Sequence, residues 1–217
     1  YSETPPEKTH LVLNAIPDDC FDARPDRDGV RDELGVPRDV RIALFVGRML
    51  KRKGIDTILK ALGPILESEN VRLVYVGEWG YTPENFFPGE DTLQESMLAE
   101  IEAQGWEGHV HFAGRRNDVP RIMASCDVLV HPARIEGFGL VLAEAMAAGL
   151  PVVASRVEGI PEVLAGTESI LVEPDDPEAV RAAVLLTLCR TPEVAAGARS
   201  LGRRRAEDFR IDRRIDA

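Results

Sequence analysis

Short apolar runs recur along the chain and alternate with segments whose apolar residues have helical spacing. The runs predict strands buried on both faces at residues 10–16, 41–46, 71–76, 109–112, 127–130, 151–154 and 169–172. Helical spacing predicts helices at residues 54–66, 92–104, 119–125, 140–148 and 177–189. This alternation predicts an α/β fold, a doubly wound parallel sheet with right-handed connections and helices on both faces.

In such sheets, ligands bind outside the carboxyl ends of the strands. The loops after Val46, Val76, Phe112, Val130 and Ala154 are therefore where a site is expected. One of them, EWGYTPENFFPGED at residues 78–91, is long for a strand-to-helix loop and rich in aromatic residues. Its sequence leaves two interpretations open, a lid over a ligand or a segment that packs on the domain surface.

Charge and composition narrow the class of protein. The 217 residues carry a formal net charge of −11, which argues against a nucleic-acid-binding surface or a basic membrane-binding surface. An anionic ligand would need a local positive site. No apolar run reaches the roughly 20 residues of a spanning helix, and the start lacks a secretory pattern, so we expect a cytoplasmic protein.

Cysteine and histidine spacing predicts no metal site and no disulfide framework. Cys20, Cys126 and Cys189 lie far apart in the chain, which is typical of free thiols in a reducing compartment. His109 and His111 alternate along a predicted strand, but no further cluster accompanies them, so a structural role is favoured.

The first candidate for chemistry is FVGRMLKRKG, residues 45–54. Gly47 follows a strand and lets backbone approach a ligand, and four positive charges follow within six residues, at Arg48, Lys51, Arg52 and Lys53. Arg48 and Lys53 could reach one anion from two sides, and Arg with Lys suits a diphosphate. The alternative is a solvated basic turn, which would oppose the dipole of the following helix.

The second candidate is HPARIEGFGLVLAEAMAAGLPVVAS, residues 131–155. A glycine-rich loop precedes a helix, and the amides of residues 137–140 would be free to bind an anion at its start. Glu144, about one turn inside, could accept two hydrogen bonds from a vicinal diol such as a ribose, and Glu136 could meet the other end of the same ligand. Otherwise Glu144 is a solvent-facing glutamate and Glu136 a favourable charge near a helix start.

These motifs together resemble a known family. The Glu136-x7-Glu144 pair, the later EGIPEVL from Glu158, the earlier GRMLKRKG and Asn14 in LVLNAIP resemble the C-terminal half of the retaining GT-B glycosyltransferases of family 4, group 1. The resemblance covers about residues 9–209, with the motifs in the family's order. It implies a Rossmann-like domain that binds a nucleotide sugar, in agreement with the predicted fold.

The resemblance also implies roles for single residues. Glu136 would act in catalysis and contact the donor sugar, and Glu144 would bind the ribose. Arg115 and Asn117 lie in the loop GRRNDV at 114–119, which would line the base. The remaining donor-binding positions are Gly47, Arg48, Lys53, Gly137, Phe138, Gly139 and Leu140. The donor would be linked to UDP, GDP or ADP, and two cations with helix amides would stabilise the leaving diphosphate without a metal or another cofactor.

The family's acceptor-binding domain is expected in a missing N-terminal half, which would also make any peripheral membrane contact. Residues 1–8 would be a linker, residues 9–194 the donor domain, and residues 195–217 a helical tail, an incomplete crossover helix. One interpretation of this Arg-rich tail is a solvated helix whose charges pair at helical spacing, and a helix that docks elsewhere is equally open. Alone, the chain would bind nucleotide but transfer sugar poorly, because alignment with the acceptor is lost.

Three other functions compete with sugar transfer. One is a nucleotide-binding module that has lost catalysis, and another is an epimerase or phosphorylase on the same fold. Glycosidase chemistry through the two glutamates is disfavoured, because it gives no account of the basic loop.

Overall fold

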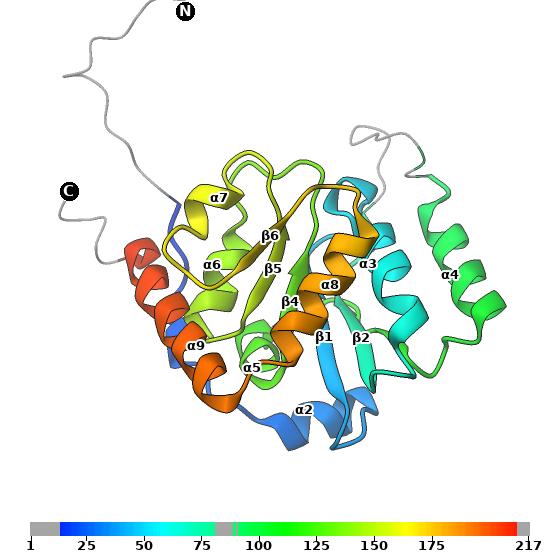
Figure 1. Ribbon diagram of the computed structural model, residues 1–217, viewed down its shortest axis with the longest axis horizontal. Coiled ribbons are helices and arrows are strands. Elements are labelled where there is room, and N and C mark those ends of the chain that lie inside the picture. Colours follow the sequence, from blue (N-terminus) through cyan, green and yellow to red (C-terminus); the bar gives the residue numbers. More distant parts are fainter. Residues whose placement is uncertain (1–13, 81–88, 90, 212–217) are drawn as a thin grey trace, which may run out of the picture.

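The computed structural model describes residues 14–80, 89 and 91–211. Its centre is a parallel sheet with the strand order β3-β2-β1-β4-β5-β6 (Figure 1). The strands are β1 (Arg41–Val46), β2 (Val71–Val76), β3 (Val110–Phe112), β4 (Val128–His131), β5 (Val152–Ser155) and β6 (Ile170–Val172). The order steps outward in both directions from β1, so the predicted doubly wound α/β fold is confirmed.

Helices cover both faces of the sheet (Figure 1). The α-helices are α1 (Asp19–Asp22), α2 (Arg27–Leu34), α3 (Ile55–Leu62), α4 (Leu93–Gln104), α5 (Val119–Ser125), α6 (Leu140–Ala147), α7 (Ile160–Val163), α8 (Pro177–Leu188) and α9 (Pro192–Ala206). Short 3-10 turns are η2 (Lys51–Lys53), η3 (Gly63–Ile65) and η5 (Glu207–Phe209).

Two apolar cores, one on each face, hold these layers together. In β1, Ile42 and Leu44 pack with residues of α2, α5 and α6, whereas Ala43 and Phe45 pack with residues of α3, α4 and α8. Alternate side chains of a strand point to opposite faces, so a strand that is buried on both sides needs the continuous apolar run seen here. This explains why the sequence predicted the strands to within one residue at each end.

The ends of the described chain differ from the prediction. Of the strand expected at 10–16, Ile16 forms only an isolated parallel bridge, with Arg210. The helix expected at 54–66 ends at Leu62 and continues as η3, where Pro64 supplies no backbone donor. The rest of that first strand, the predicted linker at 1–8, residues 81–88 and 90 of the long loop and residues 212–217 of the tail lie outside the described residues.

The Arg-rich tail forms a helix that is exposed on one side, where Arg205 pairs with Asp208 three residues later, and that packs on the domain on the other side. Helix α9 packs along α6 and buries its small residues Ala198, Gly202 and Ala206. Its arginines reach the same domain, since Arg203 donates to the carbonyl of Ala148 and Arg205 to that of Val163. None of the helices in the described part of the chain is long and apolar enough to cross a membrane.

The turns that leave β1, β2 and β3 are packed against one another. The amide of Gly47 donates to the carbonyl of Val76 at 3.0 Å, and the amide of Gly77 donates to the carbonyl of Gly114 at 2.8 Å. Gly77 has φ 140, and a Cβ at this position would overlap the carbonyl oxygen of Gly47. Glycine is therefore required where these turns meet, and the carboxyl edge of the sheet is shaped by their backbone.

Candidate functional site

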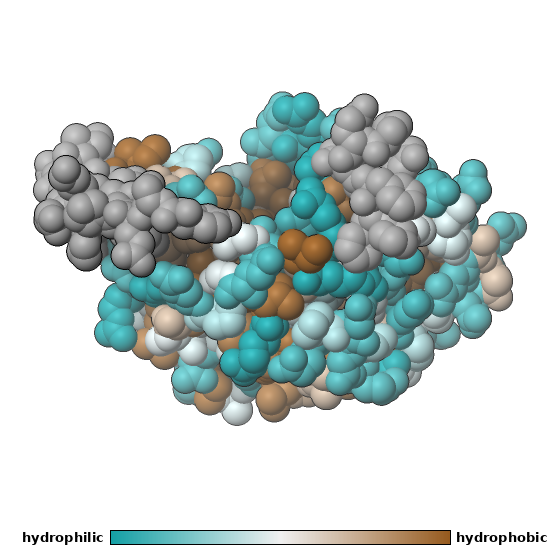
Figure 2. All heavy atoms as spheres, turned by 90° about the horizontal axis from the view of Figure 1, so that it is seen from above, coloured by the Kyte–Doolittle hydropathy of each residue, from teal (hydrophilic) through white to brown (hydrophobic). Residues whose placement is uncertain are grey.

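A cleft of about 470 Å³ opens at the carboxyl ends of β1 and β4. Figure 2 views the molecule from above onto this side, where hydrophilic residues border recessed apolar ones. Its lining joins both candidate segments, and comprises Asn14, Val46, Gly47, Arg48, Arg52, Lys53, His131, Glu136, Gly137, Phe138, Gly139, Leu140 and Val141. The basic turn and the start of α6, far apart in sequence, therefore share one hollow.

Backbone packing holds the basic turn against the loop after β4. Gly54 caps α3 with φ 72, and a Cβ there would overlap the carbonyl oxygen of Pro132. The amide of Arg134 donates to the carbonyl of Arg52 at 2.8 Å, and the Arg134 side chain pairs with Asp56 at 2.7 Å. These contacts fix the turn beside the loop, and residues of both segments line the cleft.

Two of the cations that line the cleft are not neutralised within the described part of the chain. Arg48 is exposed and makes no hydrogen bond or ion pair with a described residue. Arg52 is half-buried, and its Nε is enclosed without a partner there. An unsatisfied buried donor costs about 1–3 kcal/mol, so an anion in the cleft would relieve a cost that the free protein carries.

Lys53 faces the carboxylate of Glu136. The Lys53 Nζ lies 2.5 Å from Glu136 Oε2, and His131 Nε2 lies 3.0 Å from the same oxygen. Burial acts to raise the pKa of Glu136, but the hydrogen bonds from His131 and Lys53 outweigh it and lower this pKa to about 2. Burial also lowers the pKa of His131, and this outweighs the nearby carboxylate, so the ring is neutral near pH 7.

The loop before α6 presents free amides to the cleft, as the sequence predicted. Residues 137–140 donate no backbone hydrogen bond to another described residue, and Gly139 caps α6 with φ 80. Glu158 accepts from the amide of Glu136 at 2.7 Å, and Gly159 packs against the carbonyl of Gly137 without room for a Cβ. The segment after β5 thus supports the loop from behind, and its amides with the helix dipole favour an anion.

Three predicted donor-binding residues lie outside the cleft lining. Glu144 is half-buried one turn farther along α6, where burial and then Asp19 raise its pKa. Arg115 is exposed and lines a neighbouring hollow of about 580 Å³ together with Met49, Gly77, Glu78, Trp79, Phe112 and Gly114. Asn117 is exposed and lines neither of these two hollows.

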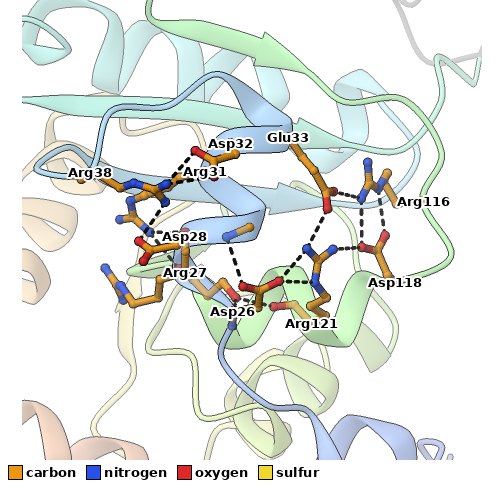
Figure 3. A network of polar contacts seen from close by, with 12 residues as sticks. Asp26, Arg27, Asp28, Arg31, Asp32, Glu33, Arg38, Arg116, Asp118 and Arg121 are labelled. Atoms are coloured by element: carbon orange, nitrogen blue, oxygen red, sulfur yellow. Dashed lines mark hydrogen bonds and ion pairs between the residues drawn. The ribbon is translucent and has the colours of Figure 1, made fainter.

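An ion-pair network fixes the loop that carries Arg115 and Asn117. Arg116 bonds Asp118 at 2.8 Å and Glu33 of α2 at 2.6 Å, and Arg121 of α5 bonds the same two carboxylates at 2.7 Å (Figure 3). Arg121 also pairs with Asp26 at 2.8 Å. The bond from Arg116, above all, lowers the pKa of Asp118 to about 2. We call these five residues the α2–α5 network.

Sequence reasoning did not select every residue of the cleft. His131 was named only as the first residue of the second candidate segment and Arg52 only as part of a basic run, yet both line the cleft. The signal for His131 was its position directly after an apolar run and before a glycine-rich loop. Within the described ranges, no group of three His, Cys, Asp or Glu side chains could hold a metal ion.

Comparison with known proteins decides the family. The family model described as "Glycosyl transferases group 1" matches residues 40–190, which contain both the basic turn and the α6 loop. This chain belongs to the glycosyl transferases group 1 family. The lipopolysaccharide glucosyltransferase WaaG of Escherichia coli K12 is 32% identical over 197 residues, which are 88% of this chain and 49% of that protein.

Solved structures of glycosyltransferases share the fold of this group 1 family member. Anabaena HepE in complex with UDP and glucose aligns with a TM-score of 0.80 and 25% identity, covering 94% of this chain and 53% of that one. The C-terminal domain of the Francisella tularensis group 1 protein LpcC aligns over 99% of its own chain, with a TM-score of 0.74 and 22% identity. The fold is therefore the C-terminal half of a GT-B glycosyltransferase, and the chain spans about half the length of the curated relatives it matches.

Proposed function

We propose that the chain binds a nucleotide-diphosphate sugar and presents it for retaining transfer to an acceptor hydroxyl. The observation that carries this proposal is the shared cleft, in which Arg48, Lys53 and the amides at the start of α6 converge. HepE, which has the same fold, has been solved with UDP and glucose.

The diphosphate would lie between the basic turn and the α6 loop. As the bond to the sugar breaks, negative charge grows on the diphosphate, and fixed cations with oriented amides stabilise that charge where it develops. Arg48 and Arg52 are not neutralised by described residues, and Lys53 needs only to exchange Glu136 for a phosphate. This arrangement supplies positive charge without a divalent metal.

The nucleoside would extend from this diphosphate. Glu144 is the proposed acceptor for the ribose hydroxyls, because it is half-buried and its carboxylate forms no hydrogen bond with a described residue. The hollow that contains Gly114 and Arg115 is the proposed place of the base. The nucleotide could be UDP, GDP or ADP. Trp79 and Phe112, whose ring centroids are 5.4 Å apart, give this hollow an aromatic wall.

The acceptor would be bound by a second, N-terminal domain. This part of the proposal rests on the length of the relatives, of which the chain spans about half. Transfer needs the anomeric carbon and the acceptor hydroxyl to be aligned, so the chain alone should bind donor while transferring sugar slowly.

The proposed function can be tested by thermal-shift measurements with UDP, GDP and ADP, followed by the sugar forms of the best nucleotide. Stabilisation should grow with ligand concentration, because a ligand that binds only the folded state shifts unfolding by mass action. The Arg48→Ala variant should lose most of this stabilisation, whereas Lys60→Ala, on an exposed position of α3, should retain it. Failure of all three nucleotides to stabilise the protein would contradict the proposal, and isomerisation of a free nucleotide sugar or consumption of orthophosphate would favour an epimerase or phosphorylase.

A further inference from the structure

We propose that His131 is a positioning residue, which holds the Glu136 carboxylate in place for a sugar hydroxyl while a donor diphosphate draws Lys53 away. The inference rests on the proposed donor site and assigns a role to a side chain that the motifs leave unexplained.

Lys53 and His131 both donate to the same carboxylate oxygen of Glu136. Lys53 Nζ is 2.5 Å and His131 Nε2 is 3.0 Å from Oε2. No hydrogen bond from a described residue reaches the other oxygen, Oε1. Glu136 lines the cleft, and its side chain is 13% exposed, so Oε1 is the acceptor left for a ligand.

The imidazole ring is held firmly enough to act as a fixed donor. His131 is the last residue of β4, its side chain is 2% exposed, and its ring stacks on Phe45 with centroids 5.9 Å apart and planes 7° apart. A neutral ring that donates to a carboxylate from Nε2 has its lone pair on Nδ1. Nδ1 is buried and has no hydrogen-bond partner among the described residues, so within that part of the chain Nε2 alone fixes the ring through a polar contact.

Lys53 has two competing partners under the proposed function. In the free protein it pairs with Glu136, and in the donor complex it would pair with the diphosphate. Loss of Lys53 would leave Glu136 with the His131 bond and with the backbone bond from its amide to Glu158. The second bond orients the main chain alone, so His131 is the side chain that keeps the carboxylate ionised and oriented.

Three substitutions separate the hydrogen bond from the packing of the ring. The His131→Phe variant retains a ring against Phe45 but has no donor, and His131→Asn carries an amide too short to reach the place of Nε2. The His131→Gln variant can set its amide nitrogen near that place and should restore the bond. Comparable melting temperatures would show that all three fold.

The first measurement needs no donor. In ¹⁵N NMR of the full chain, His131 should show protonated Nε2 and unprotonated Nδ1 at pH 7. The Nε2–H proton should lie downfield, move upfield in Glu136→Gln and stay downfield when inorganic pyrophosphate is added. The proposal would be overturned by an Nδ1–H tautomer, or by an Nε2–H chemical shift that is the same in the wild type and in Glu136→Gln. Either result would hold whether or not the protein binds a nucleotide sugar.

The second measurement is calorimetry with UDP and UDP-glucose, or with the matching pair for the nucleotide that binds best. His131→Phe and His131→Asn should bind the diphosphate within about twofold of the wild type, yet bind its sugar form about tenfold more weakly. His131→Gln should recover most of that loss. Equal affinity of wild type and His131→Phe for the sugar form overturns the positioning role, whereas binding of no diphosphate by the wild type contradicts the proposed function and leaves the NMR result to decide the role of His131.

Discussion

Two arginine-rich regions of the domain differ in how their charges are compensated. In the α2–α5 network, Arg116 and Arg121 share Glu33 and Asp118, so that every cation faces at least two carboxylates. In the basic turn, Arg48 has no partner among the described residues. The paired charges of the α2–α5 network hold a loop in place, whereas the unpaired charge of Arg48 is available to a ligand.

This difference matters because both regions look alike in sequence. The stretches GRMLKRKG and GRRNDVPR are each short, basic and placed after a strand. What separates them is the supply of carboxylates from elsewhere in the fold, since α2 brings Asp26 and Glu33 to the second stretch. Substitutions in the two regions should therefore act on different quantities, ligand affinity in one and stability in the other.

The largest effect is expected from Lys53→Ala in the basic turn. Charge-assisted bonds are worth about 1.5–3 kcal/mol, so the affinity for a nucleoside diphosphate should fall about tenfold to a hundredfold. Affinity for the nucleoside should hardly change, because it carries no phosphate. Calorimetry with both ligands checks this, with Lys60→Ala as the matched control, and equal losses on the two ligands would contradict a phosphate role.

A smaller effect is expected from Glu144→Gln. If Glu144 accepts the ribose hydroxyls, nucleotide affinity should fall about tenfold while affinity for inorganic pyrophosphate stays the same. Burial, and then Asp19, raise the pKa of Glu144. Wild-type affinity should therefore weaken as the pH falls through that raised pKa, and this dependence should disappear in the variant. Calorimetry at several pH values measures both, and an unchanged nucleotide affinity would remove the ribose assignment.

The sequence predicted the sheet well because burial on both faces leaves a direct signature, such as the apolar runs at β1 and β2. It predicted the approximate place of the cleft for a similar reason, since strand ends and glycine-rich turns are local features. Local patterns could not show that Lys53 would meet Glu136, which lies 83 residues later in the chain. They also missed how α9 packs, because Ala198, Gly202 and Ala206 are small residues with a weak apolar signal beside many arginines.

In the α2–α5 network, Arg121→Gln should alter stability and leave nucleotide affinity within about twofold. Exposed ion pairs contribute little singly, but Arg121 joins three carboxylates, so we expect the melting temperature to fall by about 2 °C. Added salt screens these pairs, so the gap between wild type and variant should narrow at 1 M ionic strength. Thermal denaturation at two salt concentrations checks the effect, and a gap that stays constant would contradict an electrostatic origin.

The smallest effect is expected from Asp118→Asn, and it depends on pH. The bond from Arg116, and more weakly that from Arg121, lowers the pKa of Asp118 from 3.8 to about 2. The ionised carboxylate thus contributes stability that is present above pH 3.8 and is lost as the pH falls towards 2. Denaturant unfolding between pH 5 and pH 2 should show that the wild type loses more stability than Asp118→Asn, which has no proton to take up at this position. Equal losses of stability in the two proteins would show that Asp118 is not ion-paired in solution. The arginines of the α2–α5 network would then be compensated by Glu33 and Asp26 alone.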